Sequence, residues 1–360
     1  MSDTRTSQAG AENAQVSSHG SEADRLPLGI ATLLFVRERG IVVLWVLLCV
    51  FFTFWDWPYF ASVANGLLIL QAAALTAVFA LAVALGVISG ALDLSVPGTA
   101  AMAAVIAGTI LTAGGPIWAA LLAGLAAGVA VGFVNGVITL TGLNPLVVTI
   151  GTLSVLTGLA SVISGGYNIS GLAALKFMGT ARYWGVPSHV FIVAAVYLVA
   201  TFFLTKTRHG VRMIATGGNP EAVRRVGINA NAYKLLGFVL SGLLAALAGL
   251  MQTALVTEAS PQAGPGIIFQ ALTAVALAGV SLAGGRGSLP KVLVGAIVLA
   301  TIADGLTIKG VPPYWATVST GVLMIGALML DKVLTHTISE RLVAIGNITV
   351  HGGAKGGRAK

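Results

Sequence analysis

The stretch NGLLILQAAALTAVFALAVALGVIS, residues 65–89, decides the fold class, because none of its side chains is charged. An α-helix needs about 20 mainly apolar residues to cross the hydrocarbon core of a bilayer. Similar runs recur along the 360 residues, of which 56% are hydrophobic and only 9% charged, with a mean hydropathy of +0.93. This composition excludes a soluble globular domain and indicates a polytopic membrane protein.

Ten apolar segments, separated by Gly, Pro or charged breaks, predict an all-α polytopic membrane protein with about ten transmembrane helices. Residues 1–39 are predicted to be a disordered cytoplasmic tail without the apolar core of a secretory signal. The transmembrane domain is placed at 40–332, with a cytoplasmic loop at 206–232, and a second cytoplasmic tail at 333–360. The spans are expected near 40–58, 65–89, 97–113, 116–140, 145–165, 188–205, 233–256, 266–283, 289–308 and 313–331.

The basic residues orient these spans. With the N-terminus in the cytoplasm, 17 of the 20 Lys and Arg residues fall in inside loops, and only Lys176, Arg182 and Lys309 fall outside. Positive residues are enriched in cytoplasmic loops, so both termini and the loop at 206–232 are predicted to be cytoplasmic. Topology therefore explains the net charge of +8, and no nucleic-acid partner is expected.

Several chemistries are not expected from the sequence. Cys49 is the single cysteine, so the chain forms no intrachain disulfide, and its 5 histidines are scattered without the spacing of a metal site. The chain also lacks the Gly-x-x-x-x-Gly-Lys-Ser/Thr motif of ATP-hydrolysing proteins. We expect a protein that is not an enzyme and that binds neither a metal nor a cofactor.

Four short matches recur in the same order at offsets of 168 to 170 residues, which predicts an internal duplication. The offset contains five spans, and an odd number inverts the second copy. Spans two to five and seven to ten are therefore predicted to be antiparallel halves, as in many transporters. The matching positions are Pro97-Gly98 with Pro265-Gly266, Ala113 to Gly115 with Ala283 to Gly285, Asn135-Gly136 with Asp304-Gly305, and Pro145 with Pro313.

Small residues at every fourth position mark two of the spans. Such stripes let helix backbones approach closely in lipid. Packing within one subunit is the favoured interpretation, and a subunit interface is the alternative. The stripes are Gly124, Gly128, Gly132 and Gly136 on the fourth span, and Gly237, Ser241, Ala245 and Gly249 on the seventh.

The polar stretch ATGGNPEAVRRVGI, residues 215–228, predicts a helix of about seven residues. Asn219 suits the N-cap, Pro220 the first helical position, Glu221 the positive end of the helix dipole and Gly227 a left-handed stop. So short a helix is not stable alone in water. It either lies on anionic lipid or docks on a cytoplasmic partner. Its small apolar area and lack of aromatic residues favour docking.

Together with this stretch, four more motifs resemble the permease subunits of bacterial ABC importers for monosaccharides, of the ribose, xylose and galactose type. The resemblance covers about residues 40–332. The other motifs are SGALDLSVPG (89–98), VNGVITLTGLNPLVVTIGTL (134–153), SLAGGRGSLPKVLVGA (281–296) and PPYWATVSTGVLMIGALMLD (312–331).

The resemblance implies a location in the bacterial inner membrane, where two permease copies form the channel. It also implies a cytoplasmic ATPase subunit that hydrolyses ATP, and a periplasmic binding protein that delivers sugar. The stretch 215–228 is then the segment that couples the permease to the ATPase. The coupling residues would be Gly217, Gly218, Asn219, Pro220, Glu221, Ala222, Arg225 and Gly227.

Polar residues within the apolar spans are candidates for the transport pathway, because a neutral sugar needs amides and hydroxyls to replace lost water. Asp93 is interpreted first as a cap at a broken helix and second as a gate or substrate contact. Asp304 is expected to face the last loop or Lys309. A proton-coupled secondary transporter that uses one of these acids is the alternative function. The candidates are Asp93, Ser95, Asn135, Asn144, Gln252, Gln270 and Asp304.

Overall fold

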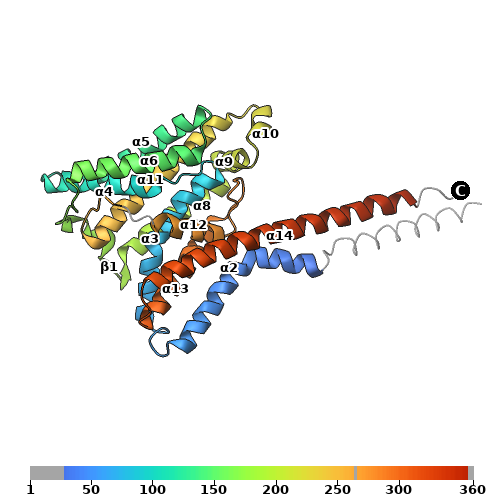
Figure 1. Cartoon of the computed structure of the whole chain (residues 1–360), viewed down its shortest axis with the longest axis horizontal. Helices are drawn as coiled ribbons and strands as arrows, with labels where there is room; N and C mark the ends of the chain where they lie inside the picture. The colour runs from blue at the N-terminus through green and yellow to red at the C-terminus, as the bar shows by residue number, and fades with distance from the viewer. Residues whose placement is uncertain (1–27, 263–265, 356–360) are drawn as a thin grey trace, which may run out of the picture. The chain divides into compact units, whose positions relative to one another are not determined.

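The computed structural model describes residues 28–262 and 266–355, and these residues are almost entirely helical (Figure 1). Two of the shortest elements, η1 and α7, lead into a small β-hairpin. The helices and strands are α2 (Leu28–Trp55), α3 (Val63–Ile88), α4 (Val96–Thr112), α5 (Ile117–Leu140), α6 (Pro145–Ser164), η1 (Ala173–Leu175), α7 (Lys176–Gly179), β1 (Arg182–Tyr183), β2 (Val186–Pro187), α8 (Ser188–Lys206), α9 (Arg208–Gly218), α10 (Pro220–Arg225), α11 (Ala230–Val256), α12 (Gly266–Leu277), α13 (Leu289–Ile308) and α14 (Tyr314–Lys355).

Seven of the described helices, or their apolar parts, are long and apolar enough to cross a membrane. Three shorter apolar helices, Arg39–Trp55, Val96–Thr112 and Gly266–Leu277, lie at the remaining predicted spans. The chain is thus an all-α polytopic membrane protein. Local sequence sets the helix ends; for example, α6 starts at Pro145 behind the cap of Asn144 and stops at Gly165, whose φ is +67°.

The structure differs from the sequence prediction in the described part of the N-terminal tail and at the eighth span. Helix α2 begins at Leu28 and α14 continues to Lys355, so the described parts of both predicted tails are helical. Leu, Ala, Arg and Glu dominate residues 31–39, and all four favour helices. The eighth span ends at Leu277 rather than at 283, because glycines with positive φ follow it at Gly279 and Gly284. Residues 1–27 and 356–360 lie outside the described residues.

By its internal contacts the chain divides into two units, Ile41–Met329 and a second unit formed by residues 1–40 and 330–360. The larger unit contains the core. Helices α3 and α11 are its most buried spans: α11 packs on α5, α4 and α3, whereas α3 also packs on α13 and α12. Large apolar side chains remain exposed on α5, α6 and α14, as expected for helices that face lipid or another subunit.

Glycines bring α5 and α11 into backbone contact. A Cβ at Gly128 would meet the carbonyl oxygen of Gly242, and one at Gly132 would meet that of Phe238. On α11, by contrast, Gly237 and Gly249 face Ser89 and Ala100 instead of α5. Both predicted stripes therefore serve packing within one chain, but they belong to two different faces.

The helix order follows the predicted duplication. Helix α11 starts 167 residues after α3, and α13 starts 172 residues after α5. The packing partners exchange in the same way, since α5 packs on α11 as α13 packs on α3, and α4 packs on α11 as α12 packs on α3. The inverted orientation of the two halves in the membrane stays a prediction.

Candidate functional site

The predicted coupling segment is a short capped helix, α10. The side chain of Asn219 accepts a hydrogen bond from the backbone N–H of Ala222 at 3.0 Å, and Pro220 occupies the first turn. Gly227 ends the helix with a φ of +78°, and the next residue, Ile228, donates to the carbonyl of Val223 at 3.2 Å. These contacts confirm the helix start and stop that the sequence predicted.

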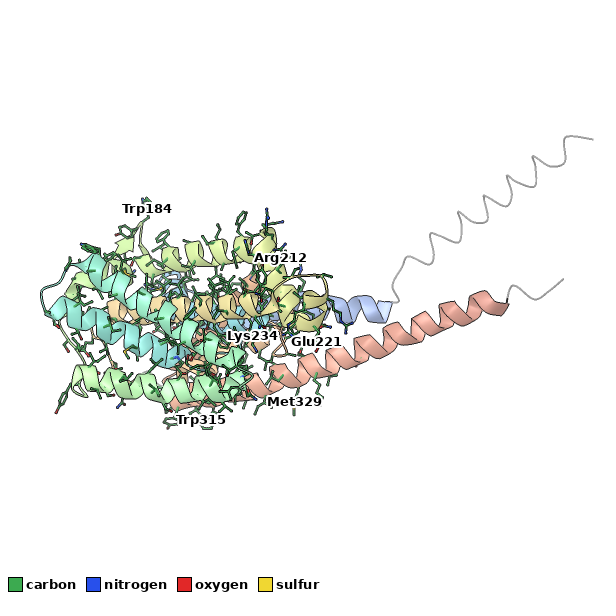
Figure 2. The ribbon with its side chains drawn as sticks, turned by 90° about the horizontal axis from the view of Figure 1, so that it is seen from above. Trp184, Arg212, Glu221, Lys234, Trp315 and Met329 are labelled. Carbon is green, nitrogen blue, oxygen red and sulfur yellow. The ribbon has the colours of Figure 1, made fainter. Side chains whose placement is uncertain are left out.

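Most of α10 is available to a partner. Val223 is buried against the rest of the chain, whereas Glu221, Ala222 and Arg225 are exposed and Val226 is 72% exposed. Figure 2 shows Glu221 at the same end of the helices as Arg212 and Lys234, with Trp184 of the β-hairpin toward the other end. Helix α10 therefore presents an exposed surface of polar and apolar side chains at one end of the membrane domain, and we call this surface the knob.

Helix α9 carries this knob, and the sequence prediction missed it. Its N-cap is Thr207, whose side chain accepts from the N–H of Gly210 at 3.1 Å. Gly210, Met213 and Thr216 recur every third residue and form the buried face. That periodicity, behind a threonine cap, was the available signal, but the polar composition of residues 206–218 was interpreted as a loop.

Two adjacent residues of the predicted coupling segment differ in their surroundings: Gly217 is partly buried in a contact within the chain, whereas Gly218 is exposed. Gly217 lies in the last turn of α9 against the end of α3, where a Cβ would meet the carbonyl oxygen of Ile88. The same carbonyl accepts a hydrogen bond from the N–H of Gly285 at 3.0 Å. A Cβ on Gly285 would meet Gly218. We call this contact of Gly217, Gly218, Ile88 and Gly285 the glycine junction.

The structure brings three of the predicted pathway residues together in a buried network. Asp93 and Ser95 precede α4 in an extended segment, and Asn135 lies on α5; all three are fully buried. Oδ1 of Asp93 accepts from the backbone N–H of Ser95 at 2.9 Å and from its hydroxyl at 2.6 Å. The amide of Asn135 donates to the Ser95 hydroxyl at 2.9 Å.

Two further residues complete this network, and both were missing from the predicted site. Ser241 of α11 donates to Oδ2 of Asp93 at 3.0 Å, and Thr152 of α6 donates to Oδ1 of Asn135 at 2.6 Å. Asp93 thus receives three hydrogen bonds and ties the non-helical segment before α4 to α11, while Ser95 ties the same segment to α5. Asp93 does not cap α4 directly, because Ser95 is the N-cap residue and no side-chain capping hydrogen bond forms at the start of α4. Its hydrogen bonds instead satisfy an otherwise costly buried polar group in the break before α4.

Thr152 places the edge of the network on an apolar groove between α5 and α6. The groove has a volume of about 800 Å³, and Asn144 and Thr152 are the polar residues in its lining. Asn144 is exposed and caps α6 through the N–H of Leu146 at 3.0 Å. An apolar wall alone is a poor match for the hydroxyls of a sugar.

The remaining predicted pathway residues lie apart from this network. Gln252 lines a small polar cavity of about 40 Å³ together with Glu258, which leaves room for water but not for a sugar. Gln270 is exposed on α12. Asp304 accepts from the side-chain amide of Asn65 at 2.8 Å.

The expected partner of Asp304 was wrong. Lys309 lies 3.2 Å from Oδ1 of Asp56 and over the ring of Trp55, at 5.7 Å from its centroid. Asp56 directly follows α2, and its side chain is fully buried, so the cation is drawn to the more deeply desolvated carboxylate. Asp56 was not among the predicted residues, because the sequence does not show that the end of the first span lies beside α13.

Comparison with known proteins shows which protein family this chain belongs to. Residues 65–328 match the family described as branched-chain amino acid transport system / permease component. The chain belongs to this family of transport permeases. The match includes the network around Asp93, the glycine junction and α10.

Three relatives of this permease carry informative names. The ribose import permease protein RbsC of Escherichia coli K12 is 33% identical over 82% of this chain and 94% of its own length. RbsC of Bacillus subtilis 168 is 33% identical over 76% and 87%, respectively. The L-arabinose transport system permease protein AraH of Escherichia coli K12 is 33% identical over 68% and 75%. No solved structure matches the chain.

Proposed function

We propose that this chain is the membrane-spanning permease subunit of an ATP-driven monosaccharide importer. The observation that carries the proposal is the exposed, capped helix α10, held by a chain that resembles ribose and arabinose permeases over most of its length. A knob of this kind is what a cytoplasmic motor needs in order to act on a membrane domain. The chain forms the pathway, and a separate ATPase subunit hydrolyses ATP, since the sequence lacks the Gly-x-x-x-x-Gly-Lys-Ser/Thr motif of ATP-hydrolysing proteins.

The proposed complex lies in the bacterial inner membrane and has three further components. Two ATPase subunits grip α10 of two permease copies from the cytoplasm, and a periplasmic sugar-binding protein delivers substrate on the other side. The exposed face of α5 and α6, with its groove, is the surface that we assign to the second permease copy. Closing two such faces together would cover the apolar groove and place Asn144 and Thr152 beside the shared pathway.

The glycine junction supplies the path from α10 into the membrane. In the last turn of α9, Gly217 contacts Ile88, the last residue of α3, and the Ile88 carbonyl accepts a hydrogen bond from Gly285 in the turn before α13. Backbone contacts of this kind leave little room for sliding, because protein interiors are closely packed. A displacement of α10 therefore moves the ends of α3 and α13 together.

The buried network has a positioning role in this proposal. Asp93 ties the non-helical segment before α4 to α11, and Ser95 ties it to α5, so that α4 moves with both helices. All of the hydrogen bonds of Asp93 come from neighbouring hydroxyl and backbone groups, as expected of a residue that positions the segment around it. The similarity to sugar permeases favours the ATP-driven function over the proton-coupled alternative.

Uptake into vesicles tests this function. The permease is reconstituted with its ATPase subunit, and sugar-loaded binding protein is added outside. We expect ribose or arabinose uptake that requires internal ATP and the ATPase subunit, and that continues when an ionophore collapses the proton gradient. Uptake that follows the gradient without nucleotide would refute the proposal.

A further inference from the structure

A second cavity lies directly behind the coupling segment. It has a volume of about 470 Å³ and is lined by the ends of α3 and α5, the last turn of α9, α10 and the start of α11. We call it the loop pocket. Among its lining residues are Thr139, Gly217, Arg224, Asn231 and Lys234.

The loop pocket contains two positive charges and no acidic side chain. Arg224 is the fifth residue of α10, and Lys234 lies in the second turn of α11, close enough for the two cations to repel each other. Lys234 is partly buried, so water screens this repulsion incompletely. Neither Arg224 nor Lys234 forms an ion pair with an acidic side chain among the residues whose side chains the structure describes, so neither pocket cation is neutralised.

Hydrogen-bond donors without partners add to these charges. Thr139 is 3% exposed, and its hydroxyl has no hydrogen-bond partner. Other helical threonines, such as Thr149 and Thr157, bond to the carbonyl four residues earlier, so Thr139 differs from them. The start of the 27-residue helix α11 also lines the pocket, and a helix N-terminus attracts negative charge.

We propose that the loop pocket binds a phosphate-type anion. Arg224 and Lys234 supply charge, while Thr139 and the first turn of α11 supply donors, and such groups in combination recognise phosphate. The phosphate comes either from the headgroup of an anionic phospholipid or from a soluble phosphate. Because Arg224 and Gly217 belong to the coupling segment, a bound anion ties α10 to the start of α11. The inference does not depend on which substrate the permease carries.

Thermal stability of the full-length protein in nanodiscs tests the proposal. In phosphatidylcholine discs, sodium phosphate is compared with sodium chloride at equal ionic strength; in a second arm, part of the phosphatidylcholine is replaced by phosphatidylglycerol. We expect saturable stabilisation in at least one arm. A response to free phosphate identifies a soluble ligand, and a response confined to phosphatidylglycerol identifies a lipid headgroup.

Variants assign the response to the pocket. Lys234→Gln is expected to raise the half-saturating concentration about tenfold, the usual size of one lost charge-assisted contact. Arg225→Gln is the matched control, because it removes the same charge from the same cytoplasmic segment outside the pocket, and its response should stay within about twofold of wild type. The proposal is overturned if neither arm stabilises the protein, or if both variants respond alike.

Thr139→Val covers the case in which Lys234→Gln does not fold. Valine has the shape of threonine without its hydroxyl, so the ligand-free protein should be as stable as wild type or more so. Its response to the anion should be weaker. An unchanged anion response in Thr139→Val, together with a misfolded Lys234→Gln, would contradict the proposed site.

Discussion

At the scale of single residues, some positions require glycine as strictly as other positions require a particular side chain. Gly217 and Gly218 are adjacent in sequence, and both would be assigned to the coupling motif. A Cβ on Gly217 would nevertheless meet the Ile88 carbonyl, while one on Gly218 would have only an ordinary contact with Gly285 at 3.6 Å. Two neighbouring glycines therefore have different structural requirements.

This difference gives a first prediction. Gly217→Ala must displace backbone, so we expect a loss of about 1–3 kcal/mol in unfolding free energy and strongly reduced ATP-dependent uptake. Gly218→Ala serves as its control and should retain stability close to wild type. The measurement is the temperature at which the purified protein loses its monodisperse peak in size-exclusion chromatography. Equal behaviour of the two variants would argue against the glycine junction.

Asp93 gives a second prediction at the same scale. Asp93→Asn keeps a side chain of the same shape that can bond both Ser95 and Ser241, so the protein should fold and still transport sugar. Asp93→Leu leaves those hydroxyls without partners and should lose about 2–5 kcal/mol of stability. Uptake and thermal stability are measured for both variants. If Asp93→Asn is stable but inactive, the acid has a chemical role beyond positioning.

At the scale of helices, the sequence predicted which helix faces pack closely, but not which helix each face packs on. The α5 glycines were read as a close-packing stripe, and they do pack on α11. The stripe on α11 was also predicted to pack closely within the subunit, and it does so on other partners: Gly237 packs on Ser89 beside α3, and Gly249 on Ala100 of α4. Spacing shows which residues share a face, whereas the partner of that face depends on contacts distant in sequence.

A third prediction concerns the α5–α11 contact. Gly132→Ala places a methyl group against the backbone of Phe238 and Val239, and should separate the helices and lower thermal stability by about 1–3 kcal/mol. Gly158→Ala on α6 is the control, because a Cβ there has no neighbour within 4 Å. The same chromatographic assay compares them. Destabilisation of both variants to the same degree would place the effect in helix propensity or insertion, not in this contact.

A fourth prediction tests whether the cap of α10 matters for docking. Asn219→Ala removes the bond to Ala222 and should cost about 1 kcal/mol in the stability of α10, whereas Asn219→Ser retains a capping oxygen. The alanine variant should therefore retain several-fold less ATPase subunit in co-purification than the serine variant. If the two retain equal amounts, the helix does not need its cap to dock.

At the scale of the whole chain, composition and charge were enough for the fold class and the positions of the spans. Local signals were also readable, and Asn219 and Gly227 cap α10 as predicted. The partner of Asp93 could not be predicted in this way, because Ser241 lies 148 residues away in sequence, on helix α11. The pairing of Lys309 with Asp56 was missed for the same reason, since nothing local in the sequence brings the two together.

A fifth prediction tests the topology. Cys49 is the only cysteine, so Cys49→Ala gives a background for single reporter cysteines. In that background, Arg225→Cys should react with an impermeant thiol reagent only from the cytoplasmic side, and Trp184→Cys only from outside. Figure 2 shows Trp184 far from the coupling end, and it is 94% exposed. Labelling of both positions from one side would overturn the span assignment.

The glycine junction also constrains the exchange of parts between related permeases. A chimera that receives a foreign α9–α10 segment to recruit a different ATPase must also receive residues compatible with Ile88 and Gly285, because the three backbones touch without intervening side chains. Chimeras that receive a segment with a larger residue at position 217 should insert into the membrane normally but show no transport when the new ATPase hydrolyses ATP. Specificity for a given ATPase can therefore be transferred only together with the residues at Ile88 and Gly285 that contact the coupling segment.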